Sequence, residues 1–203
     1  MKNSNGTQKQ FEGILDGYFE VALRENPVWS NTLGLRAGEG KLGATGLAAA
    51  KRGEIHRKRT LDKLERLPAH ELSAEQHLDR LALRAMLLAE CEDYERGVYR
   101  LDPDAVDCLF GVLLHELQRG EDEPARGKQN VRGLLKETPR YLAQSAKMID
   151  RPERVWRKIM QQSVAGEGAL FEAVETFLGP KDVKLIASAR RAVGRYHDAV
   201  MAR

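Results

Sequence analysis

Apolar side chains recur along this chain with the spacing of α-helices from residue 11 to its last turns. The first set follows the i, i+3, i+4, i+7 pattern that places side chains on one helix face: Phe11, Ile14, Leu15, Tyr18 and Ala22. A last set does the same: Val183, Ile186, Ala189, Val193, Tyr196 and Val200. The chain has neither a hairpin signal nor an internal repeat. The sequence therefore predicts an all-α fold, an irregular bundle of about seven to nine helices.

Proline and glycine divide the N-terminal part of this pattern. Residues 26–35 read Asn-Pro-Val-Trp-Ser-Asn-Thr-Leu-Gly-Leu. Pro27 disfavours helix in the residue before it and can open a short second helix, which Gly34 can close. The glycine-rich residues 36–46 then predict an exposed loop.

Later boundaries follow from capping residues and proline. Ser73 and Gln76 form a capping box for a long helix whose two apolar stripes predict a central position. We expect a polar loop over 119–127. Pro139 should kink or divide a helix over 128–149, because proline removes one backbone hydrogen bond.

Length allows one large domain or a compact pair of subdomains in 203 residues. We assign residues 1–10 to a disordered tail and 11–203 to a single helical domain. Charged residues are 31% of the chain, and its net charge is +3. That excess is too small to indicate nucleic acid or an anionic membrane as a partner.

The N-terminus and the cysteines indicate a reducing compartment. Residues 1–10 lack the apolar core of a signal peptide, and no run of about 18 apolar residues predicts a membrane-spanning helix. Cys91 shares a helical stripe with Leu83 and Leu87, which favours a buried free thiol over a disulfide. We therefore expect a cytoplasmic protein.

One segment matches the opening of a zinc motif. His115-Glu116 begins the pattern His-Glu-x-x-His, in which two imidazoles four residues apart bind zinc and the Glu acts as general base. Arg119 occupies the fifth position, so the second ligand is missing. We interpret His115 as an ordinary residue near the C-terminal end of a helix.

Other candidate sites have ordinary interpretations too. The run Gly38–Gly43 matches Gly-x-Gly-x-x-Gly, but a dinucleotide site needs flanking strands, so we interpret it as a flexible loop. The basic residues over 51–59 could bind phosphate, but intervening acids favour a solvated face. Trp29 and Trp156 are predicted to anchor the core. No nucleophile has a visible base partner, so we assign no catalytic, cofactor-binding or metal-binding residue.

Four segments carry a likeness to a known family. They are Asn26-Pro27 leading to Leu33-Gly34-Leu35, the stretch Leu72–Asp79, Leu134–Pro139 with the following Tyr141–Gln144, and Asp150–Trp156. In this order they resemble the N-terminal half of the bacterial domain-of-unknown-function 885 family, over about Phe11–Pro180. Members of that family look like zinc metallopeptidases of the thermolysin-like superfamily.

The resemblance implies a part in an enzyme without its catalytic groups. The family's loop after the Leu-Gly element is usually acidic, whereas residues 37–46 here are mostly Gly and Ala. The family's zinc ligands, including a His-Glu motif closed by Pro-Gly-His, lie in a second half that would follow Arg203. We expect zinc only in that half, and no cofactor here.

Two functions follow as hypotheses. In the first, the chain is the helical wall of a peptide-binding cleft in a metallopeptidase-like hydrolase and is inactive alone. Its partner would be a catalytic half, and a large exposed face should mark the docking site. In the second, it is a stand-alone helical protein acting through protein association, with a second copy as the natural partner. An unrecognised active site is a third interpretation.

Overall fold

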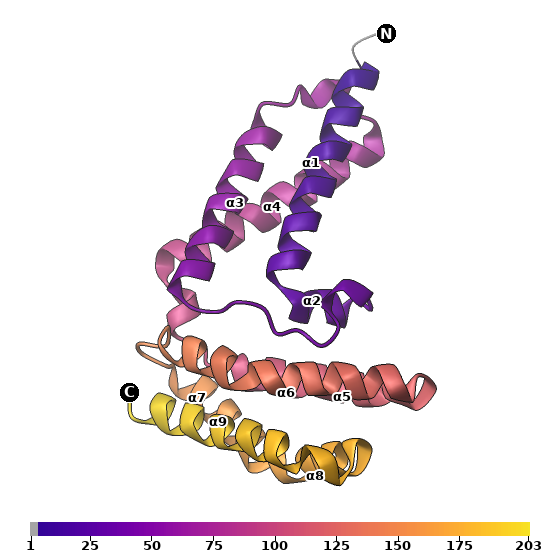
Figure 1. Ribbon diagram of the computed structural model, residues 1–203. Helices are drawn as coiled ribbons and strands as arrows, with labels where there is room; N and C mark the ends of the chain where they lie inside the picture. The colour runs from indigo at the N-terminus through magenta and orange to yellow at the C-terminus, as the bar shows by residue number, and fades with distance from the viewer. Residues whose placement is uncertain (1–3) are drawn as a thin grey trace. The chain divides into compact units, whose positions relative to one another are not determined.

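The computed structural model describes residues 4–203, and every regular element among them is helical. The helices are α1 Ser4–Glu25, α2 Pro27–Thr32, α3 Leu47–Glu65, α4 Ala74–Arg96, α5 Ala105–Asp122, α6 Pro124–Ala146, α7 Arg154–Ala165, α8 Glu167–Leu178 and α9 Val183–Met201 (Figure 1). Short 3-10 turns are η1 Arg36–Gly38, η2 Ala69–Glu71, η3 Val98–Arg100 and η4 Pro180–Asp182. The predicted all-α, multi-helix fold is confirmed.

The described residues fall into two compact units. The first unit comprises residues 4–25 and 47–98, and the second comprises residues 26–46 and 99–203. Each has its own cluster of buried apolar side chains. The prediction of a single domain over 11–203 did not include this division, because apolar spacing shows which residues are buried and not which core they join.

The chain is ordered earlier than the sequence predicted. Helix α1 begins at Ser4, so the predicted disordered tail over 1–10 is wrong for residues 4–10, while residues 1–3 lie outside the described residues. Thr7 is buried, and its Oγ1 donates to Glu71 Oε2 at 2.5 Å. Gln8 donates to the Glu71 carbonyl at 3.4 Å. These polar contacts lie in the part of α1 that precedes Phe11, the first apolar residue of the predicted stripe.

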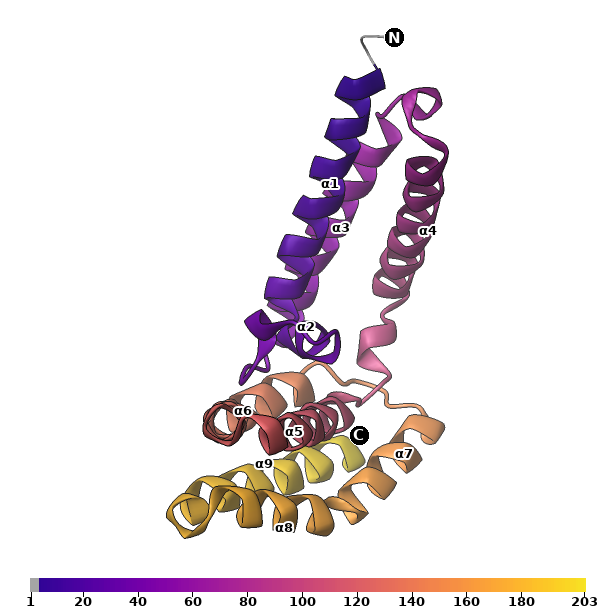
Figure 2. The same cartoon turned by 90° about the vertical axis from the view of Figure 1, so that its right-hand side faces the viewer.

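In the first unit, α1, α3 and α4 enclose a small core (Figure 2). Its buried side chains are Phe11, Ile14, Tyr18, Leu64, Leu67, Leu83 and Leu87. The predicted capping box is confirmed: Gln76 N donates to Ser73 Oγ at 3.2 Å, and Ser73 N donates to Gln76 Oε1 at 3.3 Å. Gly97 ends α4 at φ 72°, a left-handed conformation that favours glycine.

Helix α4 buries only one of its two apolar stripes. Cys91 lies with Leu83 and Leu87 on the packed side and is a free buried thiol, as predicted; desolvation raises its pKa. The second stripe, which we name the α4 stripe, consists of Leu78, Leu81, Ala85 and Leu88. Its leucines are 66%, 45% and 40% exposed. The predicted central position of this helix is therefore wrong.

The second unit is built around α6, which packs against both α5 and α9 (Figure 1). The buried residues of these three helices repeat at helical spacing: Val106, Leu109, Val112, Leu113, Val131, Leu134, Leu135, Leu142, Ile186, Ala189, Val193, Tyr196 and Val200. Helices α7 and α8 complete the core through Met160, Phe171 and Val174. The inward face predicted for α9 is confirmed from Ile186 to Val200, whereas Val183 at its start is 53% exposed.

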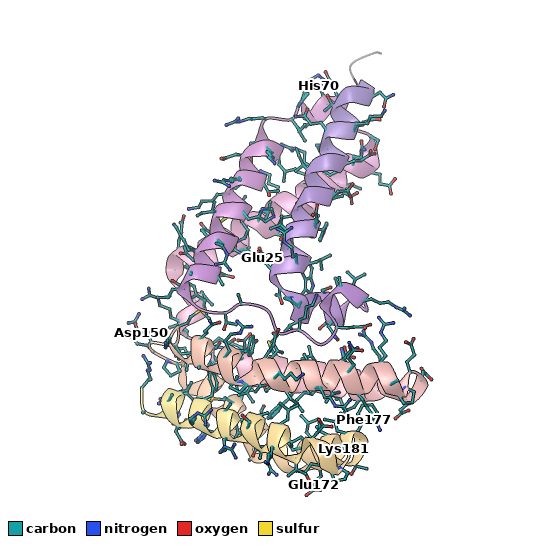
Figure 3. All side chains as sticks on the ribbon, viewed as in Figure 1. Glu25, His70, Asp150, Glu172, Phe177 and Lys181 are labelled. Carbon is teal, nitrogen blue, oxygen red and sulfur yellow. The ribbon has the colours of Figure 1, made fainter. Side chains whose placement is uncertain are left out.

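The connection between α5 and α6 is a tight turn. Helix α5 continues to Asp122 and α6 starts at Pro124, so the predicted polar loop over 119–127 is wrong. Proline is favoured in the first turn of a helix. A Cβ on Gly127 would lie 2.6 Å from the Gly120 Cα, and the Phe177 ring, labelled at the end of α8 in Figure 3, covers both glycines. Two glycines thus let the helices approach closely.

Two other glycine and proline positions affect the helices differently. Helix α6 runs through Pro139 as one element, so the predicted division does not occur there. Burial of Leu134, Leu135 and Leu142 on either side of the proline holds this turn in the core. Gly166 does separate two helices, because α7 ends and α8 begins on either side of it.

Candidate functional site

Three segments singled out in the sequence meet in the second unit. They are the Asn26–Leu35 segment containing α2, the glycine run Gly38–Gly43, and His115-Glu116 in α5. A set of hydrogen-bonded side chains joins them to α6. We name it the Glu116 network; it consists of Asn31, Glu39, Glu116, Arg119 and Asn130.

A fully buried carboxylate lies at the centre of this network. Glu116 has no solvent exposure, and neither has Asn31. Asn31 Nδ2 donates to Glu116 Oε1, and Asn130 Nδ2 donates to Glu116 Oε2 at 2.9 Å. Both carboxylate oxygens therefore have amide donors, as a buried ionised group requires.

Arg119 supplies the positive charge nearest to this carboxylate. Its Nη1 lies 3.9 Å from Glu116 Oε1, and its Nη2 donates to the Asn31 carbonyl at 2.8 Å. The position at which the zinc motif would have its second histidine therefore holds an arginine that fixes α2. Glu116 is occupied by structural hydrogen bonds and has no second ligand beside it.

Glu39 extends the network toward the surface. Its Oε2 accepts from Asn130 Nδ2 at 3.1 Å, so one amide group joins two carboxylates. Arg126 Nε donates to the same oxygen at 2.7 Å, and this hydrogen bond raises the pKa of Arg126. The glycine run is therefore fixed to α6 through its acidic residue.

The glycines of this run permit close packing. A Cβ on Gly38 would lie 2.3 Å from the Pro27 carbonyl oxygen, and one on Gly133 of α6 would lie 2.5 Å from the Gly40 oxygen. Leu42 is buried, and its N–H donates to Glu137 Oε2 at 2.8 Å. These contacts show a loop packed on α2 and α6, whereas the sequence predicted an exposed, flexible one. The Leu42 N–H already donates to Glu137, so it is not available to bind a phosphate group as the main-chain N–H groups of a dinucleotide-binding loop do.

The basic stretch on α3 is largely paired with acids within the first unit. Lys58 Nζ lies 2.9 Å from both Glu54 Oε1 and Glu95 Oε1. Arg57 Nε lies 3.6 Å from Glu54 and 3.8 Å from Glu90. Glu54 is only 1% exposed. The sequence predicted a solvated charged face on this helix, whereas the Glu54 carboxylate is buried.

A buried tyrosine lies beside the same charges. The Tyr18 ring stacks on His56 with centroids 5.5 Å apart, and His56 Nε2 lies 3.3 Å from the Tyr18 carbonyl. Burial, together with the Glu90 charge, raises the pKa of Tyr18 to about 12. The shift takes this phenol further from ionisation at neutral pH, where an ordinary tyrosine is already protonated.

The arrangement of acids and histidines bears on metal chemistry. Among residues 4–203, no three His, Cys, Asp or Glu side chains are placed to hold a metal ion together. His115 lies outside the Glu116 network, and His56 belongs to the other unit.

Within the described part of the chain, no helix combines the length and apolar character needed to cross a membrane.

Known proteins add no assignment to this geometry. Neither the family models nor the curated proteins nor the solved structures gave a match to the chain. The likeness to a metallopeptidase family therefore remains a proposal. What the structure contributes is the Glu116 network, which can position helices and loops.

Sequence reasoning missed the partners of Glu116. Asn31 and Asn130 lie 85 and 14 residues from it along the chain. One signal was present, because Glu116 follows Leu109 by seven residues and Leu113 by three and so falls on the inward stripe of α5. A charged residue on the buried face of a helix needs hydrogen-bonding partners there. The helical spacing does not show which residues these partners are.

A group of carboxylates around the start of α5 predicts a pH effect on stability. Partial burial, with Asp104 and Asp107 nearby, raises the pKa of Asp102 from 3.8 to about 6. Since folding raises this pKa, the folded state is favoured below pH 3.8 and loses that advantage as pH rises through about 6. Asp102→Asn should therefore resemble wild type at low pH and unfold at a higher temperature above pH 6.

Thermal unfolding followed by circular dichroism across this pH range tests the effect. Asp62→Asn, which removes the same charge at an exposed position of α3, provides the matched baseline. A Tm difference between Asp102→Asn and wild type that does not vary with pH would contradict the prediction.

Proposed function

We propose that this chain is the helical scaffold of a metallopeptidase-like hydrolase. It would form one wall of a peptide-binding cleft, and a separate catalytic half would hold zinc. The Glu116 network agrees with a scaffold role, because its carboxylates and amides are all used in holding α2 and the glycine run on α5 and α6.

The α4 stripe carries the proposal. Leu78, Leu81 and Leu88 are each at least 40% exposed, and Ala85 between them is exposed too. Their spacing of three and four residues gives a continuous apolar seam on one helix face. An exposed apolar surface of this kind supports a binding site for another polypeptide.

Reconstitution with the catalytic half tests the proposal. An adjacent or downstream reading frame that encodes His-Glu-x-x-Pro-Gly-His would supply that half. We expect zinc-dependent peptide hydrolysis from the two polypeptides together and none from either alone. Leu81→Glu should abolish their co-purification, because it puts a charge in the seam. Leu114→Glu, at a 48% exposed position of α5, is the matched control.

A different result would favour the second function. If no such catalytic half exists, and the chain alone forms a dimer that Leu81→Glu dissociates while Leu114→Glu does not, the scaffold proposal fails. The chain would then be a stand-alone protein that associates with itself through the α4 stripe. The heptad-like spacing of the stripe suits a second identical helix.

A further inference from the structure

Helix α7 exposes large apolar side chains although one of its faces is packed. Val155, Trp156 and Ile159 are 59%, 41% and 39% exposed, while Met160 is fully buried. We name the three exposed residues the α7 patch. The sequence predicted that Trp156 anchors the core; that prediction is wrong, because the core of the second unit takes Met160 from this helix instead.

Cations without acidic partners lie beside the α7 patch. Arg151, Arg154 and Lys158 are exposed, and none forms an ion pair with another described residue. Glu153 is the one acidic residue between 151 and 162. At about 100° per residue, Arg154, Lys158, Val155, Ile159 and Trp156 follow one another around one continuous arc of the helix. The arc is basic on one side and apolar on the other.

The basic residues beside the α7 patch argue against a protein as its main partner, because lysine is depleted in protein interfaces. Binding to a lipid surface does not require a partner of complementary shape. It is favoured by basic residues beside tryptophan and branched aliphatic side chains.

We infer that α7 binds the surface of an anionic membrane. Its cations would lie among lipid phosphates, while Val155, Trp156 and Ile159 enter the boundary of the acyl chains. The mode is peripheral, so it needs no membrane-spanning helix. The net charge of the whole chain gave no reason to expect it, because the basic cluster is local. This inference goes beyond the scaffold proposal and does not depend on a catalytic half.

Vesicles of defined composition test this inference. The Trp29→Phe protein keeps Trp156 as its single tryptophan. We expect its emission to shift to the blue with vesicles that contain phosphatidylglycerol and to stay unchanged with phosphatidylcholine alone. The full chain should co-sediment with the anionic vesicles, and higher salt should release it.

Charge reversal separates this surface from a general basic effect. Arg154→Glu combined with Lys158→Glu should weaken co-sedimentation about tenfold or more, because each cation adds to the attraction. Arg191→Glu combined with Arg195→Glu makes the same charge change on exposed positions of α9 and should have little effect. Equal binding to both kinds of vesicle, or equal loss in the two double variants, would overturn the inference. Peptidase reconstitution in lipid-free solution reads out the scaffold proposal separately.

Discussion

Glu116→Ala should lower the free energy of unfolding of this protein by about 3 kcal/mol, since it removes a buried charged acceptor. Asn31 would lose its buried acceptor, Asn130 would keep only Glu39, and Arg119 would lose the nearest opposite charge. Urea unfolding followed by circular dichroism measures the loss. Trp29 lies on α2, two residues from Asn31, so in a Trp156→Phe background its fluorescence reports whether α2 separates first.

Two further variants make this prediction specific. Glu116→Gln keeps one acceptor oxygen and the shape of the side chain, so its loss should be smaller, roughly 1 to 2 kcal/mol. Glu121→Ala removes the same type of residue from an exposed position of α5 and should change stability by less than about 0.5 kcal/mol. If Glu116→Ala behaved like Glu121→Ala, the network would contribute nothing to stability.

Local sequence patterns predicted those parts of the fold that depend on neighbouring residues. The Ser73–Gln76 capping box involves residues three apart, and both of its hydrogen bonds occur. The inward stripe of α9 was predicted from spacing alone and is buried from Ile186 to Val200. Hydrogen bonds within a turn and the helical repeat are local, so one sequence is enough to predict them.

Whether a predicted face is covered depends on residues far away in the chain. Trp156 was predicted to anchor the core and is 41% exposed. The α4 stripe has the same apolar spacing as the buried stripe beside it. Periodicity shows which side chains share a face, whereas tertiary packing decides which face is buried.

The candidate site could be predicted only in fragments. The glycine run, the Asn26–Leu35 segment and His115-Glu116 were each recognised, but as three separate motifs with three separate interpretations. The side-chain link between the glycine run and Glu116 passes through Asn130, which no motif contains. The approach of Gly133 to Gly40 was also invisible, because no local pattern records the distance between two backbones.

Gly133→Ala should destabilise the second unit by roughly 2 to 3 kcal/mol, although alanine is the better helix former. The new Cβ would lie 2.5 Å from the Gly40 carbonyl oxygen, too close for any real contact. The loop cannot easily retreat, because Leu42 N donates to Glu137 and Arg140 Nη2 donates to the Gly43 carbonyl at 2.9 Å. Steric overlap should therefore outweigh helix propensity.

Gly111→Ala gives the matched control, with the opposite expected sign. Gly111 lies in α5, where an added Cβ would meet nothing within 4 Å. Only the intrinsic preference remains there, so alanine should stabilise the protein by about 1 kcal/mol. Urea unfolding of both variants isolates the packing of the glycine run, because each makes the same chemical change inside a helix. If Gly133→Ala stabilised the protein as Gly111→Ala does, the run would not be packed on α6, and the Glu116 network would lose its outer half.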